Sequence, residues 1–313
     1  MLLYLHDEFA LHDTGQHPEN AHRIERTNAR LRAAGGLAEQ VTCCADWKPA
    51  SIGQCATAHD IGYLKALHER IAGMFAGSHL SVEADTVVSP HSWDVAMLAA
   101  GAAIDAVDRV LDAEDNVAMV VARPPGHHAV PDGPMGFCLV NNVALAAQQA
   151  LARGVERILI VDFDVHHGNG TQDIFYQDPR VGFLSMHRYP FYPGTGSETE
   201  TGTGDGLGAI RNLPITFGTS ADQMIDRFRS AVDDFSARMR PELLLVSAGF
   251  DAHADDPIGS LGLQNEHFEW LTEILVQAAQ AHSGGRIVSL LEGGYHLQRL
   301  PECVEIHGRR LSQ

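Results

Sequence analysis

Short runs rich in Val, Ile and Leu alternate along this chain with longer segments of helical period, and this alternation restricts the fold more than any other feature. A strand of a parallel sheet is buried on both faces, so it reads as a continuous apolar run, and a crossover helix connects it to the next strand. The predicted strands are Leu2–Leu5, Val117–Ala122, Ile158–Val165, Val181–Met186, Leu243–Ala248 and Arg286–Leu291. The predicted helices include Ser92–Leu111, Asn142–Arg153, Asp222–Met239 and Glu266–Ala281. The pattern predicts an α/β fold with three layers, α/β/α, around a mainly parallel central sheet.

Composition narrows the class of protein. The 313 residues are 45% hydrophobic and contain no linker-like stretch, which favours one domain over residues 1–313. A formal charge of −18 disfavours nucleic acid or an anionic membrane as a partner. The amino terminus lacks a basic signal region, no run of about 18 apolar residues exists, and five cysteines without C-x-x-C favour a reducing compartment. We therefore expect a cytoplasmic protein, and a homo-oligomer is left open.

Polar residues gather where the predicted strands end. The sequence reads "RPPGHH" after the strand beginning at Val117, "DFDVHHGNG" at the end of the strand beginning at Ile158, "SAGFDAHADDP" after the strand beginning at Leu243, and "EGGYH" after the strand beginning at Arg286. In open α/β sheets ligands bind beyond the carboxyl ends of the strands. These four segments are therefore expected to converge on one rim of the sheet.

The D-x-D-x-H spacing at the second of these ends suggests a metal site. If the strand extends to Val165, Asp162, Asp164 and His166 project from one face and the intervening apolar residues face the other way. A catalytic zinc takes three nitrogen or oxygen ligands and keeps one position open, and Asp251 is the natural further ligand. The alternatives from the residues alone are a buried ion-pair cluster and the mere start of a loop.

Two adjacent histidines and one tyrosine are candidates for acid–base and electrostatic roles. His127 and His128 are held between prolines and small residues, and Tyr295 follows two glycines, where its phenol could reach a polarised carbonyl. Alone, each has an ordinary structural interpretation, because the chain contains 18 histidines. Most of them are expected to be ordinary surface or helix residues, among them His6, His12, His68, His79, His91, His267, His282 and His307.

Several other patterns exclude reaction classes. The stretch "GDGLGA" fits G-x-G-x-x-A formally, but a short strand rather than a helix is expected after it, which argues against dinucleotide binding. The sequence contains no phosphate-loop, nucleophile-elbow or H-E-x-x-H motif. Cys138 is expected to pack rather than to act as a nucleophile.

Taken together, six motifs resemble the zinc-dependent histone deacetylase family, which has the arginase/deacetylase fold. They are "RPPGHH", "GFCLVNNVALAA", "DFDVHHGNGTQDIF", "YPGTG", "SAGFDAH" and "LEGGY", in the family's order and spacing. The resemblance extends from "HPENAHR" at residues 17–23 to Tyr295. Within the family, the chain resembles the class II enzymes and the bacterial histone deacetylase-like amidohydrolases, because Asn169 stands where class I enzymes of animals carry aspartate.

This resemblance assigns a role to each matching position. It implies zinc ligands at Asp164, His166 and Asp251, and catalytic residues at His127, His128, Tyr295, Asp162 and Asn169, with Asp162 behind His127 and Asn169 behind His128. Substrate contacts are implied at Gly136, Phe137, Tyr192, Ile258 and Gly293, with Phe137 and Tyr192 as the aromatic walls of an acyl-lysine tunnel. Arg23 resembles the arginine of the acetate-release channel, although Ala21 replaces the usual proline.

The resemblance also implies structural potassium. One site would use Asp162, Asp164, His166, Ser185 and Met186, and a second would use Phe175, Asp178 and Val181.

Three functions are compared. The first is zinc-dependent hydrolysis of N-ε-acetyl-lysine in proteins or peptides by a metal-activated water. The second is an amidohydrolase for acetylpolyamines or other small acetylated amines. Apolar Ile258 at a gatekeeper position disfavours it, whereas an acidic loop at Asp13–Glu19 is expected to line the mouth and favours it. The third is a non-catalytic acyl-lysine binder, which the filled catalytic positions disfavour.

A binuclear manganese enzyme would need a second set of carboxylates, and Asp255 is the only spare one nearby.

Overall fold

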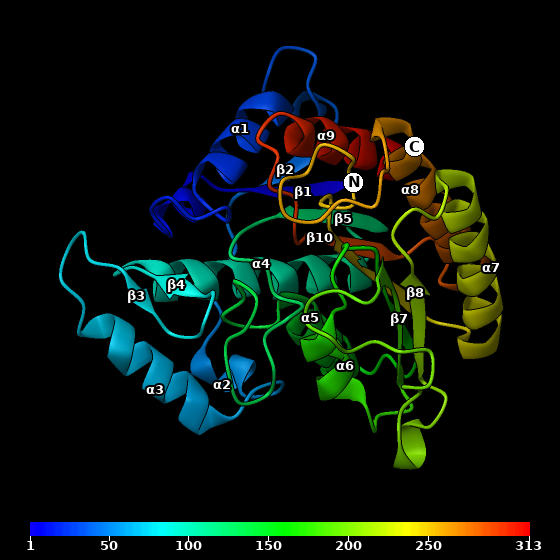
Figure 1. Ribbon diagram of the computed structural model, residues 1–313, viewed down its shortest axis with the longest axis horizontal. Coiled ribbons are helices and arrows are strands. Elements are labelled where there is room, and N and C mark those ends of the chain that lie inside the picture. Colours follow the sequence, from blue (N-terminus) through cyan, green and yellow to red (C-terminus); the bar gives the residue numbers. More distant parts are fainter.

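The computed structural model describes residues 1–313 and contains an eight-stranded sheet in which every neighbouring pair of strands is parallel (Figure 1). Its strands are β1 (Leu2–Leu5), β2 (Thr42–Cys44), β5 (Val117–Val121), β6 (Ile158–Asp162), β7 (Val181–Arg188), β8 (Ile210–Ile215), β9 (Leu243–Ala248) and β10 (Ile287–Leu291). They are ordered β2-β1-β5-β10-β9-β6-β7-β8. The predicted α/β class with a parallel central sheet is therefore confirmed.

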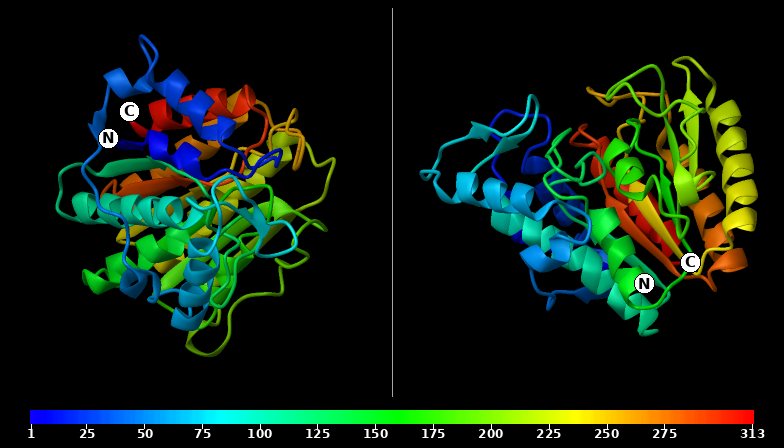
Figure 2. Two further views of the ribbon diagram at one scale, coloured as in Figure 1. Left: turned by 90° about the vertical axis from the view of Figure 1, so that its left-hand side faces the viewer. Right: turned by 90° about the horizontal axis from the view of Figure 1, so that it is seen from below.

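Helices cover both faces of the sheet, as the two views of Figure 2 show. On one face, the helices α1 (His22–Leu31), α9 (Arg299–Leu311), α8 (Asn265–His282) and α7 (Ala221–Met239) pack in that order. On the other face lie α4 (Ser92–Leu111) and α5 (Asn142–Ala152). The remaining helices are α2 (Ile52–Cys55), α3 (Ile61–Ala72) and α6 (Asn169–Phe175), with short 3-10 turns at Asp7–Leu11, Leu37–Glu39 and Gly204–Gly206.

The sheet and both helical layers share one continuous core of 87 buried residues, which runs from Leu2 to Leu311. Strands β6 and β9 are buried along their whole length, as their unbroken apolar sequences predict. A separate antiparallel hairpin, β3 (Leu80–Ser81) and β4 (Val87–Val88), projects beside α3 at the left of Figure 1. None of the helices combines the length and the apolar composition that crossing a membrane would need.

The structure corrects the predicted strand beginning at Ile158. It ends at Asp162 and not at Val165, because two carboxylates capture the next backbone N–H groups. Oδ1 of Asp162 accepts from the N–H of Asp164 at 3.0 Å, and Oδ1 of Asp164 accepts from the N–H of His166 at 2.9 Å. The two turns that result, rather than the alternation of a strand, bring these side chains together.

Some elements were not identified from the sequence. Strand β2 has only three residues, two of them exposed, at the edge of the sheet. Helix α1 buries Arg23, Thr27 and Asn28 together with two apolar residues, so it lacks a clear apolar stripe. The short strand expected after "GDGLGA" is present as β8.

Candidate active site

The four polar segments meet at one edge of the sheet. Strands β5, β10, β9 and β6 are consecutive neighbours, and all are parallel, so their carboxyl ends lie side by side. The segments that follow them begin at Ala122, Glu292, Gly249 and Phe163. The predicted convergence on one rim is confirmed, and the register of the central strands is its cause.

Asp164, His166 and Asp251 come together in the way a metal site requires. All three are buried, and one potential ligand atom from each lies within 4.8 Å of the others. Nδ1 of His166 lies 3.0 Å from Oδ1 of Asp164 and 3.1 Å from Oδ2 of Asp251. One nitrogen and two carboxylate donors fit zinc, which takes three protein ligands and keeps a fourth position open.

One oxygen of Asp251 has no hydrogen-bond partner. Its Oδ1 accepts from the N–H of Val165 at 2.9 Å, but the buried Oδ2 accepts from nothing. Leaving a buried charged oxygen without a hydrogen bond is costly, and burial together with the nearby charge of Asp164 raises the pKa of Asp251 to about 7. Its nearest cationic neighbour is Nδ1 of His166, at 3.1 Å, which also lies beside Asp164. A cation held by the three residues would satisfy this oxygen and offset the repulsion between the two carboxylates.

Glycines allow the close packing of this site. The N–H of Gly293 donates to Oδ2 of Asp164 at 2.8 Å, and a Cβ at Gly293 would collide with the carboxylate of Asp251. A Cβ at Gly249 would collide with Asp164 in the same way. The chain must therefore be glycine where it passes these carboxylates.

The tandem histidines have different partners and different charge. Nδ1 of His127 lies 2.9 Å from Oδ2 of Asp162, and Nδ1 of His128 lies 2.7 Å from Oδ1 of Asn169. Burial alone would lower the pKa of His127, but the carboxylates of Asp162 and Asp164 outweigh it and raise this pKa to about 10. Burial, together with the charges of the neighbouring histidines, lowers the pKa of His128 well below its usual value. One ring is thus cationic and the other neutral.

Sequence reasoning missed Glu292. This buried carboxylate accepts from the N–H groups of Gly126 and His127, at 2.6 and 3.1 Å, and so fixes the backbone of the histidine pair. Burial raises the pKa of Glu292 to about 7, despite the opposing charge of His127. The available signal was a carboxylate at the end of a buried apolar run, as Asp162 is at the end of β6. We call the following set the acidic cluster: Asp162, Asp164, Asp251, Glu292, His127 and His166.

A cavity of about 170 Å³ opens above this cluster. It is lined by Asp85, His128, Gly136, Phe137, His166, Phe191, Tyr192, Ile258 and Tyr295. The structure thus brings together seven residues that were singled out from the sequence, while Asp85 and Phe191 were not foreseen. The phenol of Tyr295 is buried, and burial raises its pKa well above the usual value, so the hydroxyl keeps its proton.

Local backbone conformation presents Phe137 to the cavity. Gly136 and Phe137 both have positive φ, +54° and +71°, within a tight turn closed by hydrogen bonds between Met135 and Cys138. The N–H of Phe137 donates to Oγ1 of Thr86 at 3.1 Å, which ties this turn to the β3–β4 hairpin. Cys138 is fully buried beneath the turn, as its predicted packing role requires.

Phe191 belongs to a stack that reaches His166. The two rings lie 5.3 Å apart and nearly parallel, and the guanidinium of Arg188 lies 4.2 Å from the centre of the Phe191 ring. Arg188 also donates to the carbonyl of Gly259 at 3.0 Å. This arginine therefore joins the segment of Tyr192 to that of Ile258, so two walls of the cavity are held together.

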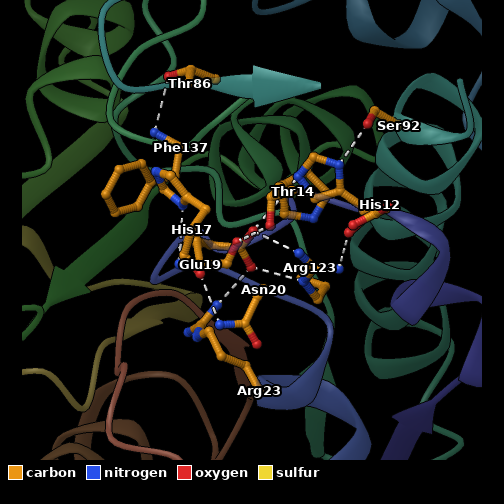
Figure 3. A network of polar contacts seen from close by, with 12 residues as sticks. His12, Thr14, His17, Glu19, Asn20, Arg23, Thr86, Ser92, Arg123 and Phe137 are labelled. Atoms are coloured by element: carbon orange, nitrogen blue, oxygen red, sulfur yellow. Dashed lines mark hydrogen bonds and ion pairs between the residues drawn. The ribbon is translucent and has the colours of Figure 1, made fainter. Parts of the chain in front are cut away.

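Arg23 is fully buried behind Tyr295, with its guanidinium 5.0 Å from the centre of the phenol ring. It pairs with Glu19, which also binds Arg123 (Figure 3). The expectation that the acidic loop Asp13–Glu19 lines the mouth is therefore wrong for Glu19, because two arginines draw its carboxylate into the interior. We call Glu19, Arg23, Arg123 and the adjacent His12 the arginine cluster.

Two further expectations from the sequence need correction. His12 is buried and lies 2.6 Å from the hydroxyl of Ser92, so it is not an ordinary surface or helix residue. His307 lies in helix α9, as expected, but it is buried there and bridges Thr272 and Ser289. Asp255, the spare carboxylate for a second metal, is exposed and pairs with Arg299 at 2.9 Å.

The residues assigned to potassium lie around β7 and after α6. Ser185 pairs in register with Asp162 across β6 and β7, and Met186 follows it. The carbonyl of Phe175 accepts from the N–H of Asp178, and the carbonyl of Asp178 accepts from the N–H of Val181, at 3.1 and 3.4 Å.

Comparisons with known proteins agree with this geometry. Residues 17–311 match the histone deacetylase domain. The chain is 39% identical to the histone deacetylase-like amidohydrolase of Pseudomonas aeruginosa, over 82% of this chain and 67% of that protein. It is 37% identical to a probable deacetylase of Archaeoglobus fulgidus, over 95% of this chain and 81% of that protein.

A plant relative and a solved structure extend the comparison. Histone deacetylase 10, chloroplastic, of Oryza sativa subsp. japonica is 36% identical, over 97% of this chain and 71% of that protein. The crystal structure of the HDA15 HD domain superposes with a TM-score of 0.92 at 30% identity, covering 100% of this chain and 88% of that one. The chain therefore belongs to the histone deacetylase family, and it is a hydrolase that acts on amides.

Proposed function

We propose that this protein is a single-domain, zinc-dependent deacetylase that hydrolyses the amide of N-ε-acetyl-lysine in proteins or peptides. The observation that carries this proposal is the convergence of Asp164, His166 and Asp251, with the Oδ2 of Asp251 accepting no hydrogen bond, beside an aromatic-walled cavity. Zinc held by these three residues would supply a Lewis acid, which polarises the amide carbonyl and makes water a nucleophile at neutral pH.

His128 acts as the general base and then the general acid. The amide oxygen of Asn169 can only accept, so Nδ1 of His128 carries a hydrogen and Nε2 keeps a free lone pair. The lowered pKa of His128 keeps this ring neutral before reaction. Nε2 takes a proton from the attacking water and delivers one to the leaving amine.

His127 and Tyr295 stabilise the negative charge that develops on the substrate. His127 is held cationic by Asp162, and it faces the same site as His128, with ring centres 4.0 Å apart. Tyr295 keeps its hydroxyl proton and donates it as a hydrogen bond to the oxyanion. Neither group has to ionise during the reaction.

The aromatic walls bind the methylene stem of the substrate. Phe137 and Tyr192 line the cavity together with Phe191, and Gly136 and Ile258 complete its apolar sides. Gly293, expected to contact the substrate, packs against Asp164 and Asp251 and does not line the cavity. Burying the stem there excludes water from the reacting carbonyl. Arg23, behind Tyr295, would place a positive charge beside the path by which the acetate product leaves.

Structural potassium and a cytoplasmic setting complete the proposal. Backbone oxygens of Asp162, Asp164 and His166, with Ser185 and Met186, would bind one ion, and Phe175, Asp178 and Val181 would bind a second. Replacing potassium with a larger organic cation in the buffer should then lower the thermal midpoint, as a scanning calorimeter would record.

A small acetylated amine is the second candidate substrate. Asp85 lines the cavity, and Glu83 lies two residues away on the same hairpin, so a distal ammonium would find a carboxylate at the mouth. This observation replaces Glu19, which is buried, as the support for acetylpolyamines. Ile258, which is apolar and also lines the cavity, still favours a peptide.

The test compares kcat/KM of the zinc-loaded protein on an acetyl-lysine peptide and on N-acetylputrescine in one buffer. We expect the peptide to be preferred by about 100-fold or more, equivalent to about 2.7 kcal/mol. The variant Asp85→Asn serves as the matched control, because it should weaken only the diamine. A reversed preference that Asp85→Asn abolishes would replace the first candidate with the second.

A further inference from the structure

Glu19 joins two buried arginines that belong to different segments (Figure 3). Its Oε1 accepts from Nε of Arg123 at 2.8 Å and from Nη1 of Arg23 at 3.0 Å, and its Oε2 accepts from Nη2 of Arg123 at 2.7 Å. All three side chains are at most 1% exposed. Two guanidinium groups therefore share one carboxylate, away from water.

The other donors of Arg23 hold the backbone just before Tyr295. Its Nε donates to the carbonyl of Gly294 and its Nη2 to the carbonyl of Glu292, each at 2.6 Å. From the opposite side, Asp164 accepts from the N–H of Gly293. Two consecutive glycines have no side chains to pack and have a wide choice of backbone angles. The position of this segment is therefore set by its hydrogen-bond partners, and Arg23 is one of them.

Arg123 connects Glu19 to the loop that supports the cavity wall. Its Nη1 donates to the carbonyls of Phe9 and His12. The same loop carries His17, whose ring meets that of Phe137 edge-on at 4.5 Å. Figure 3 shows this chain of contacts from the interior to the tunnel wall.

We propose that Glu19 is a positioning residue of the deacetylase reaction. By holding Arg23 against the carbonyls on either side of Gly293, it fixes the backbone from which Tyr295 reaches the oxyanion. Glu19 lies behind this segment and acts only through Arg23. This inference rests on the proposed function, since Tyr295 is the hydrogen-bond donor there. Without the carboxylate, two like charges would face each other in a medium of low dielectric, and Arg23 would turn away.

The experiment is a double-mutant cycle between Glu19→Gln and Tyr295→Phe on the zinc-loaded protein with an acetyl-lysine peptide. In the wild-type background, Glu19→Gln should lower kcat about 10- to 100-fold with a smaller change in KM, because a misplacement of about 1 Å costs this much. In the Tyr295→Phe background the same substitution should cost less than about threefold, because the hydroxyl it misplaces is already gone. Zinc content should not change.

A matched control separates positioning from general destabilisation. Asp105 is partly buried, accepts from the hydroxyl of Tyr4 and pairs with Arg109, and it lies on α4 away from the segment Glu292–Tyr295. Asp105→Asn should destabilise the fold and leave kcat unchanged. If Glu19→Gln does not fold, Arg23→Lys tests the same link, because it keeps the charge near Glu19 and loses the planar fork that spans two carbonyls.

Two results would overturn this inference and leave the proposed function intact. One is an unchanged kcat in Glu19→Gln, and the other is an equal loss of kcat with and without the hydroxyl of Tyr295. Arg23→Lys must show the same coupling to Tyr295, and purely additive losses there would also overturn it. Full activity of Tyr295→Phe by itself would instead refute the proposed role of Tyr295 and the inference with it.

Discussion

Two clusters of buried charge lie on opposite sides of the segment Glu292–Tyr295, and they are satisfied in different ways. The arginine cluster has two guanidinium groups and one carboxylate, and each oxygen of Glu19 accepts at least one hydrogen bond. The acidic cluster has four carboxylates and two histidines, and one oxygen of Asp251 accepts none. Protein groups alone complete the first cluster. The second sets four carboxylates against two histidines and leaves one buried oxygen without a hydrogen bond, and this difference distinguishes a structural ion network from a site that fits a cation.

Removing a donor from the acidic cluster should have the largest effect. We expect Asp251→Ala to retain less than about one tenth of a zinc ion per chain, because two remaining donors hold zinc poorly, and its turnover should fall by about 1000-fold or more. Metal content is measured by plasma mass spectrometry after dialysis. Glu19→Ala is the comparison, since it alters the other cluster and should keep its zinc. Near-stoichiometric zinc in Asp251→Ala would show that the ligand set is wrong.

Removing only the hydroxyl of Tyr295 should separate chemistry from metal binding. We expect Tyr295→Phe to fold normally, to keep its zinc, and to lose about 100- to 1000-fold in kcat, because a hydrogen bond to the oxyanion contributes this much. Steady-state kinetics on an acetyl-lysine peptide provides the measurement. A variant as active as the wild type would exclude the role assigned to this hydroxyl.

In metal-free protein, substitutions in the two clusters should change the free energy of unfolding by different amounts. Glu19→Gln leaves two buried arginines without a counter-charge and should cost about 3–5 kcal/mol. Asp251→Asn removes a negative charge that repels Asp164 and keeps an oxygen for the N–H of Val165, so it should be nearly neutral or stabilising. Both values come from urea unfolding at pH 7 of protein treated with chelator. Equal destabilisation by the two substitutions would contradict the comparison.

The pH dependence of stability should differ in sign between Glu292 and His12. Burial raises the pKa of Glu292 to about 7, so between about 4.5 and 7 the folded state holds a proton that the unfolded state has lost, and stability falls as pH rises. Burial, aided by Arg123, lowers the pKa of His12 to about 3, so between about 6.5 and 3 the unfolded state binds the extra proton, and stability falls as pH falls.

Each of these groups should contribute a slope of at most about 1.4 kcal/mol per pH unit to the free energy of unfolding. Glu292→Gln and His12→Gln should therefore each remove such a slope, and the two slopes have opposite sign. Unfolding free energies of metal-free protein from pH 4 to pH 7.5, relative to the wild type, provide the measurement. Slopes of the same sign in both variants would show that the two clusters do not differ in charge as described.

Much of the fold was predictable because buried parallel strands leave an unbroken apolar signal. Strands β1 and β9 and helix α4 have the predicted bounds. Helix α1 was not identified, because its buried face is formed partly by Arg23, Thr27 and Asn28, whose partners lie elsewhere in the chain. A periodicity of apolar residues cannot detect a helix that packs through buried polar groups.

The sequence by itself determined the class of the fold, the rim on which the polar segments meet, and the candidate set Asp164, His166 and Asp251, because each depends on local spacing or on the ends of apolar strands. Only the tertiary structure decided the partners of the charged residues. Glu19 is buried because Arg123, 104 residues away, binds it, and Glu292 supports His127 across 165 residues. Charge is satisfied through space, so no pattern along the chain distinguishes a carboxylate paired in the interior from one at the mouth of the cavity.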